Sequence, residues 1–173
     1  MKRTYKNIYL IGMPGAGKSY WAEQIAAAFN LNCIDLDDMI SVRTGHTING
    51  FFERFGETSF RELEQQTLVQ IIEVFPSGTV IACGGGTPCF HDNLAKMKQS
   101  GMVVYLDAPM ETLMEHLENE TEQRPLLSKE DWPLDMEELL KKRKGIYEKA
   151  DVVLPAKNLS VGDFMSVLND SLL

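Results

Sequence analysis

Cysteine is scarce in this chain and long apolar runs are absent. These two absences argue against a disulfide-bonded secreted protein and against a membrane-spanning one. The three cysteines, Cys33, Cys83 and Cys89, are odd in number and show no C-x-x-C spacing, so reduced thiols in a cytoplasm are the simplest interpretation. No apolar run approaches the roughly 18–20 residues of a membrane span. The basic start of the chain is followed by no signal-peptide apolar region, and we expect no membrane partner.

Basic residues are also in deficit, because 17 Lys and Arg stand against 25 Asp and Glu for a net charge of −8. A nucleic-acid-binding surface is normally basic, so we expect no nucleic-acid partner. Any anionic substrate must then be held by a local cluster of Arg and Lys. A length of 173 residues with 44% hydrophobic residues predicts a single domain, residues 1–173, with a sizeable core.

What the chain does contain is the stretch GMPGAGKS, Gly12 to Ser19, which fills every fixed position of the pattern G-x-x-x-x-G-K-[ST]. An apolar run at 8–11 precedes it and a helical pattern at 18–29 follows, which is the context that a phosphate-binding loop needs; a chance glycine-rich turn is the alternative. Lys18 would reach the outer phosphates, and the Ser19 hydroxyl would sit on Mg²⁺. The residues predicted to bind the phosphates of a nucleoside triphosphate are Pro14, Gly15, Ala16, Gly17, Lys18 and Ser19.

Short apolar runs alternate with helical periodicity, which is typical of βαβ units and a parallel sheet. The predicted strands are 8–11, 33–35, 79–83, 103–106 and 152–154. The predicted helices are 18–29, 37–44, 48–55, 59–75, 91–99, 110–118, 134–150 and 161–172. The polar, aperiodic segment 118–133 is typical of a lid over a nucleotide site, with an idle surface loop as the alternative.

Three carboxylates, Asp35, Asp37 and Asp38, follow the second predicted strand. The carboxyl ends of parallel strands face the ligand crevice, and alternating strand side chains predict that residues 35 and 37 point the same way. Asp35 would hold Mg²⁺, through water, and Asp37 would accept a hydroxyl proton or orient the attacking oxygen. In the alternative, Asp37 or Asp38 caps the next helix, and both kinds of role fit within the three residues.

Three glycines, 84–86, follow the third predicted strand. They permit close approach of a ligand and expose backbone N–H groups beside the phosphate loop, whereas a flexible turn is the alternative. Thr87 is a polar candidate for the same pocket. Cys83 and Cys89 fit small pocket or core residues better than nucleophiles, because no catalytic-dyad pattern accompanies them.

Three arginines are candidates for binding an anion, because the planar guanidinium suits a carboxylate or a phosphate. Arg61 lies among acidic residues, Arg124 lies in the predicted lid, and Arg143 lies on a late helix. For Arg61 alone, a solvated helix face with pairing to Glu57 or Glu64 fits equally well.

Taken together, these motifs resemble shikimate kinase, a family of small P-loop enzymes of the nucleoside-monophosphate-kinase type. The similarity spans nearly the whole chain in family order: GMPGAGKS, Asp35-Leu36-Asp37, the block G-E-x-x-F-R-x-x-E at 56–64, the triple glycine, R-P-L-L at 124–127, and Arg143 four residues before Tyr147. The phosphate loop alone identifies only a superfamily. The later motifs are far more specific.

The resemblance implies a three-layer α/β/α fold with a five-stranded parallel sheet in the order 2-3-1-4-5. Region 37–64 would form a shikimate-binding subdomain. The reaction would be transfer of the ATP γ-phosphoryl group to the 3-hydroxyl of shikimate, in the biosynthesis of aromatic amino acids, by a cytoplasmic monomer.

The resemblance also assigns roles by matching positions. The catalytic residues would be Lys18, Asp37 and Arg124, and Arg124 would close over ATP with the lid. The shikimate-binding residues would be Asp37, Arg61, Gly84, Gly85, Gly86 and Arg143, with both arginines on the substrate carboxylate. The loop after the fifth strand lacks the arginine that many relatives have there, which leaves Lys157 and Asn158 as candidates for the adenine side.

Two other functions fit parts of this pattern. One is a kinase of another small metabolite, such as gluconate or a nucleoside monophosphate. The arginine pair favours an acceptor with a carboxylate, which gluconate shares. The other is a nucleotide-dependent sensor that transfers nothing, and the intact Lys18, Asp35, Asp37 and Arg124 argue against it.

Overall fold

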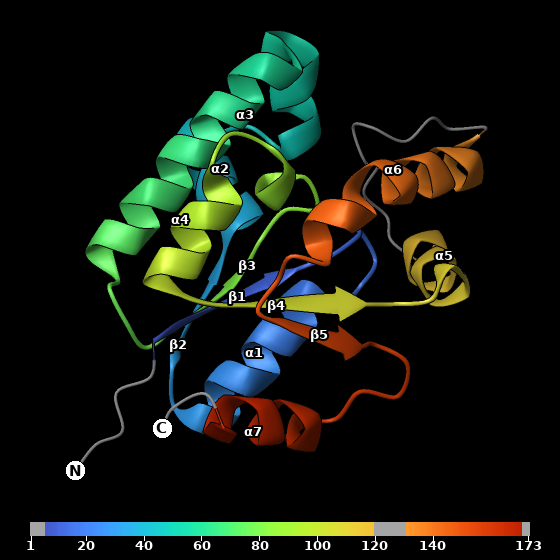
Figure 1. Cartoon of the computed structure of the whole chain (residues 1–173). Coiled ribbons are helices and arrows are strands. Elements are labelled where there is room, and N and C mark those ends of the chain that lie inside the picture. Colours follow the sequence, from blue (N-terminus) through green and yellow to red (C-terminus); the bar gives the residue numbers. More distant parts are fainter. Residues whose placement is uncertain (1–5, 120–130, 171–173) are drawn as a thin grey trace.

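Five parallel strands form the centre of the molecule in the computed structural model, which describes residues 6–119 and 131–170 (Figure 1). The strands are β1 (Asn7–Ile11), β2 (Asn32–Asp35), β3 (Thr79–Ala82), β4 (Gly101–Asp107) and β5 (Val152–Pro155). Their order is β2-β3-β1-β4-β5 and every neighbouring pair is parallel. The predicted order 2-3-1-4-5 is therefore confirmed.

Helices cover both faces of this sheet. They are α1 (Lys18–Phe29), α2 (Leu36–Thr44), α3 (Ile48–Val74), α4 (Asn93–Ser100), α5 (Met110–Glu118), α6 (Trp132–Tyr147) and α7 (Val161–Asp170), and a 3-10 turn, η1 (Thr87–Cys89), precedes α4. Figure 1 shows α1 and α7 on one side of the sheet and α3, α4 and α6 on the other. This arrangement confirms the predicted three-layer α/β/α fold.

The central strand β1 is buried along its full length, as expected for a parallel strand with helices on both faces. The order of the sheet places the carboxyl ends of β2, β3 and β1 next to one another. The loops that follow β1 and β3, at 12–17 and 83–86, and the start of α2, which directly follows β2, therefore lie at one edge. In open α/β sheets this edge is where ligands bind.

Several helix boundaries differ from the prediction, each for a local reason. The predicted break between two helices is confirmed by a kink at Gly56, whose φ of 79° and ψ of 170° are not helical, although helix continues on both sides within α3. The helix predicted from 91 begins at Asn93, because His91 has a left-handed φ of 52°. The helix predicted at 134–150 is wrong at both ends. It starts two residues earlier, with Pro133 in its first turn, and ends at Tyr147.

No helix within residues 6–119 and 131–170 is long and apolar enough to cross a membrane.

Candidate active site

The loop between β1 and α1 lines a cavity of about 720 Å³. Gly12, Gly15 and Gly17 have φ angles of 147°, 81° and 81°, a range that glycine adopts without a steric penalty. Gly17 is the N-cap of α1, where no side chain makes a capping hydrogen bond and the first turn holds no acidic residue. The N-terminal amides of α1 and the positive end of its dipole are therefore suited to bind a polyphosphate.

The predicted phosphate-loop residues, 14–19, all line this cavity. The Nζ of Lys18 donates to the carbonyl oxygens of Gly12 at 3.0 Å and Met13 at 2.9 Å. These bonds hold the ammonium group along the loop, where it can pair with the outer phosphates of a bound nucleotide.

Asp35 and Asp37 line the same cavity, but for a different reason than the one predicted. β2 ends at Asp35, and Asp37 lies in the first turn of α2, so the alternation of strand side chains does not apply. The Oδ1 of Asp35 accepts from the backbone N–H of Asp37 at 3.0 Å and of Asp38 at 3.3 Å. Asp35 is therefore the helix cap, and the alternative in which Asp37 or Asp38 caps α2 is wrong.

Ser19 and Asp35 form a pair of oxygen donors beside the phosphate loop. The Ser19 hydroxyl donates to Oδ2 of Asp35 at 2.5 Å. Mg²⁺ prefers oxygen ligands and keeps several waters, so one or two protein groups with substrate phosphates suffice to hold it. The described residues contain no cluster of three or more His, Cys, Asp or Glu side chains that could enclose a metal. The pair thus fits Mg²⁺ that is bound mainly through a nucleotide and water.

The triple glycine lies against both predicted substrate arginines. A Cβ added to Gly85 would lie 3.1 Å from Nη1 of Arg143, and one added to Gly86 would lie 2.6 Å from both Nη1 and Nη2 of Arg61. Because Gly85 and Gly86 are consecutive, the two guanidinium groups are close to the same dipeptide. Gly84 and Gly85 also line the phosphate-loop cavity, so the arginines lie at its border.

Arg61 is buried, with 6% of its surface exposed, so the alternative of a solvated helix face is wrong. The predicted pairing is nevertheless present twice. Nε and Nη2 donate to Glu57 at 3.2 and 3.1 Å, and Nη1 donates to Glu64 at 2.9 Å. The guanidinium also lies 4.2 Å from the ring centre of Phe90 and 5.2 Å from that of Phe60, within the range of cation–π attraction. These contacts fix its orientation.

Arg143 is equally buried, at 6% exposure, but its electrostatic surroundings differ. No carboxylate within residues 6–119 and 131–170 forms an ion pair with it. It lines a second cavity of about 500 Å³ together with Glu57, Cys89 and Phe90, whereas Arg61 lines neither cavity. Among the described residues, Arg143 therefore offers an anion a positive charge that no carboxylate pairs.

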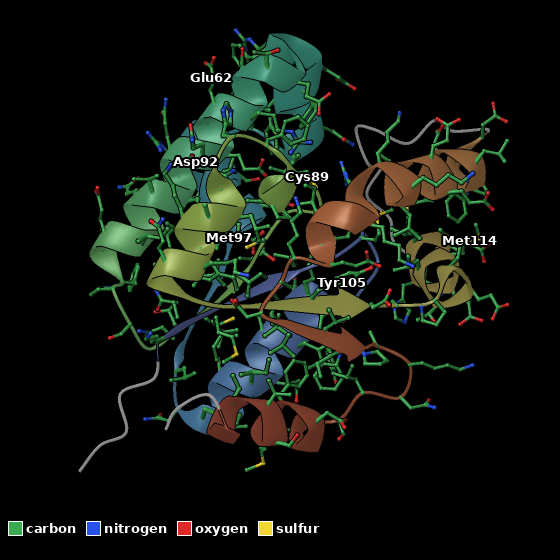
Figure 2. The ribbon with its side chains drawn as sticks, in the orientation of Figure 1. Glu62, Cys89, Asp92, Met97, Tyr105 and Met114 are labelled. Atoms are coloured by element: carbon green, nitrogen blue, oxygen red, sulfur yellow. The ribbon has the colours of Figure 1, made fainter. Side chains whose placement is uncertain are left out.

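The two thiols near the site agree with their interpretation as core or pocket residues. Cys83 is buried and lines the first cavity, and burial raises the pKa of its thiol. Cys89 lies between α3 and α6 (Figure 2). Burial raises the pKa of its thiol as well, and this effect outweighs the positive charges of Arg143 and Arg61, which lower the pKa. A raised pKa lowers the thiolate fraction at neutral pH, so neither thiol is suited to nucleophilic attack.

Thr87 is not a pocket residue, contrary to its prediction. Its side chain is fully buried, and its hydroxyl donates to Oε1 of Glu64 at 2.6 Å. The tight turn that follows the glycines, in which the Thr87 amide bonds to the Gly84 carbonyl at 3.1 Å, directs the side chain toward α3.

Lys157 and Asn158 line the phosphate-loop cavity, as do several residues that sequence reasoning missed. The missed residues are Tyr20, Trp21, Thr112, His116 and Leu159. Tyr20 and Trp21 directly follow the loop serine, and this proximity was a signal available in the sequence. No sequence signal pointed to His116, because its ring nitrogen Nδ1 lies 2.7 Å from the carbonyl oxygen of Gly15, a residue 101 positions away in the chain.

Arg124 and most of the predicted lid, 118–133, lie outside the described residues, which omit 120–130.

Comparison with known proteins gives a consistent result across the chain. A family profile described as shikimate kinase matches residues 14–170. A shikimate kinase of Paracidovorax citrulli is 36% identical over 164 residues, which cover 93% of this chain and 88% of the relative. A shikimate kinase of Azobacteroides pseudotrichonymphae is 38% identical over 166 residues, which cover 94% and 97%.

Solved structures are similar over the same length. The shikimate kinase of Acinetobacter baumannii in complex with shikimate has a TM-score of 0.90 and 32% identity, with 99% of this chain and 97% of that chain covered. The shikimate kinase of Bacteroides thetaiotaomicron has a TM-score of 0.83 and 34% identity, with 96% of each covered. A sugar kinase from Janibacter, with a TM-score of 0.64 and 16% identity, shares the fold alone.

Proposed function

The chain belongs to the shikimate kinase family and catalyses the ATP-dependent phosphorylation of the 3-hydroxyl of shikimate, and from this premise we propose which residues perform each part of the reaction. Arg61 and Arg143 bind the shikimate carboxylate, and Asp37 binds its ring hydroxyls. The observation that carries this assignment is that both guanidinium groups lie beside Gly85 and Gly86, at the border of the phosphate-loop cavity.

The two arginines contribute differently. The charge of Arg61 is already matched by Glu57 and Glu64, while its guanidinium carries further N–H groups for the substrate carboxylate. Arg143 has no such partner among the described residues, so it supplies the positive charge that balances the bound acid. An acidic protein thereby binds an anionic substrate through local contacts with two guanidinium groups and not through its overall charge.

The phosphoryl transfer itself requires positioning and charge neutralisation more than covalent chemistry. Asp37 accepts the proton of the 3-hydroxyl as that oxygen bonds to the γ-phosphorus, and the bond from the γ-phosphorus to the β–γ bridging oxygen breaks so that ADP leaves. Lys18 and Arg124 offset the negative charge that develops on the transferred group. Ser19, with Asp35 through water, would hold Mg²⁺, which would supply neutralisation of the phosphate charge.

The same proposal covers the organisation of the chain. Residues 1–173 form a single kinase domain, in which 37–64 is the shikimate-binding subdomain and 118–133 is a lid that excludes water from the transfer. Asp37 and Arg61, which we propose to bind shikimate, both lie within 37–64, and this supports the assignment of that range as the shikimate-binding subdomain. Three free thiols support a reducing cytoplasm as the compartment. The family resemblance favours a monomer, and light scattering tests this by comparing the mass in solution with the chain mass of 19.5 kDa.

An ADP-release assay with four acceptors tests the acceptor. We expect shikimate to stimulate ADP release, and gluconate, AMP and CMP to leave it at the rate seen with ATP alone. Equal stimulation by gluconate would mean that the arginine pair accepts any small carboxylate. A flat response to all four would favour a sensor that binds ATP without transferring a phosphoryl group.

Replacing Gly86 with alanine tests the placement of Arg61. The new Cβ would lie 2.6 Å from both terminal nitrogens of Arg61, while the φ of Gly86 is −86° and suits any residue. The guanidinium, as the end of a flexible side chain, would move rather than the backbone. We expect the KM for shikimate to rise about tenfold, the loss of one charge-assisted hydrogen bond, with the KM for ATP unchanged.

The matched control for that variant is Gly145→Ala, because a Cβ at Gly145 on α6 would meet nothing within 4 Å. Its KM values should equal those of the unmodified enzyme. A Gly86→Ala enzyme with an unaltered KM for shikimate would contradict the proposed role of Arg61.

A further inference from the structure

A buried hydrogen-bond relay connects Thr87 to Arg61 through Glu64. It begins at Thr87, the first residue of η1, which is fully buried, as is Glu64 on α3. The Thr87 hydroxyl donates to Oε1 of Glu64 at 2.6 Å, and the other oxygen, Oε2, accepts from Nη1 of Arg61 at 2.9 Å. The Glu64 carboxylate thus connects a rigid backbone turn to a guanidinium group.

The anchor of this relay is well fixed. The backbone amide of Thr87 bonds to the carbonyl oxygen of Gly84 at 3.1 Å, and its carbonyl oxygen accepts from Nδ2 of Asn93 at 2.9 Å. The position of the Thr87 side chain is therefore set by the turn after the glycines and by α4.

The relay is also close to the reacting groups. A Cβ added to Gly84 would lie 3.0 Å from Oε1 of Glu64, 3.0 Å from Oγ1 of Thr87 and 3.1 Å from Oδ1 of Asp37. The Glu64 carboxylate and Asp37 thus both lie against Gly84, which lines the phosphate-loop cavity.

We infer that Thr87 is a positioning residue for shikimate binding: its hydroxyl holds the Glu64 carboxylate, which in turn orients the Arg61 guanidinium toward the substrate. The inference rests on the proposed role of Arg61. A carboxylate can only accept hydrogen bonds, and burial gives it no water to replace a lost donor. Without the hydroxyl, the long side chains of Glu64 and Arg61 regain rotamers that do not present the guanidinium to the substrate.

The experiment compares Thr87→Val, which keeps the shape and removes the donor, with Thr87→Ser, which keeps the donor. We expect Thr87→Val to raise the KM for shikimate about tenfold, as for the loss of a hydrogen bond to a buried charge, with the KM for ATP unchanged. Thr87→Ser should stay close to the unmodified enzyme. Thr87→Ala, which also lacks the donor and adds no bulk, serves in the same comparison if Thr87→Val does not fold.

Thr79→Val is the matched control. Thr79 is likewise fully buried, on β3, but its hydroxyl oxygen has no hydrogen-bond partner among the described residues. Both KM values should therefore be unchanged. If Thr79→Val raises the KM for shikimate as much as Thr87→Val does, the effect is a general one of core hydroxyls and the inference is overturned.

Two further outcomes would overturn it. The first is an equal rise of both KM values in Thr87→Val, which indicates a merely structural role, and the second is a Thr87→Ser enzyme as impaired as Thr87→Val. Arg143→Ala, measured in parallel, separates this inference from the proposed function. If Arg143→Ala raises the KM for shikimate and Thr87→Val does not, only the role of Thr87 fails. If neither does, the proposed binding site fails with it.

Discussion

Replacement of Lys18 by methionine should leave a folded protein that phosphorylates shikimate about a hundredfold to a thousandfold more slowly, the usual loss for one group that stabilises transition-state charge. Methionine retains most of the length of lysine but carries no charge and no N–H donor. It therefore loses the bonds to the carbonyls of Gly12 and Met13 and cannot offset the charge on the transferred phosphoryl group. The measurement is kcat at saturating ATP and shikimate.

Two controls make this result specific. Lys144→Met removes an exposed lysine on α6 whose carboxylate partner, Glu148, lies 3.9 Å away, and its kcat should be unchanged. A thermal melt of the Lys18→Met protein establishes that the fold survives. If that protein melts normally and keeps a kcat within a few fold of the unmodified enzyme, Lys18 does not act in the transfer.

Replacement of Arg143 by alanine should raise the KM for shikimate by about one to two decades, which corresponds to a charge-assisted hydrogen bond of roughly 1.5–3 kcal/mol. The effect should exceed that of Gly86→Ala, because the charge of Arg143 is unmatched among the described residues whereas Arg61 remains paired with Glu57 and Glu64. The KM for ATP should change little, since Arg143 lies beside Gly85 and does not itself line the phosphate-loop cavity that residues 14–19 line. Steady-state kinetics with each substrate varied in turn provides both constants.

Arg54→Ala is the control for Arg143→Ala. Arg54 carries the same charge in the segment 37–64 but is exposed, with its guanidinium over the ring of Phe55 at 5.3 Å. Its loss makes the net charge of −8 more negative by the same one unit without touching the glycines, so the KM for shikimate should stay the same. Equal effects of the two variants would mean that the overall field, and not a local contact, captures the acid. An equal loss of ATP affinity in Arg143→Ala would contradict its assignment to the acceptor.

The phosphate loop could be predicted from the sequence because its requirements are local. Glycines at 12, 15 and 17 permit the positive φ angles that the loop adopts, and the apolar run before it and the helical pattern after it lie within a few residues. The alternation of apolar runs and helical periods was likewise sufficient for a parallel sheet, and the family resemblance supplied the strand order.

The roles of individual polar residues near the site were less accessible, because they depend on partners far along the chain. Asp35 was predicted as a metal ligand and also proves to cap α2, which depends on where β2 ends. Thr87 was assigned to the pocket, yet it bonds to Glu64, 23 positions away. Spacing in the sequence does not tell on which side of a turn a side chain points, since that is decided by packing.

The sequence by itself therefore determined that the chain binds ATP, through a loop whose glycines and lysine act within eight consecutive positions, and that it resembles one kinase family. Only the tertiary structure decided that Arg61 is buried and doubly paired while Arg143 has no carboxylate partner among the described residues. The physical reason is that the value of a charge depends on its burial and on its neighbours within a few ångströms. For these two arginines those neighbours come from η1 and the triple glycine as well as from their own helices, and the fold alone brings them together.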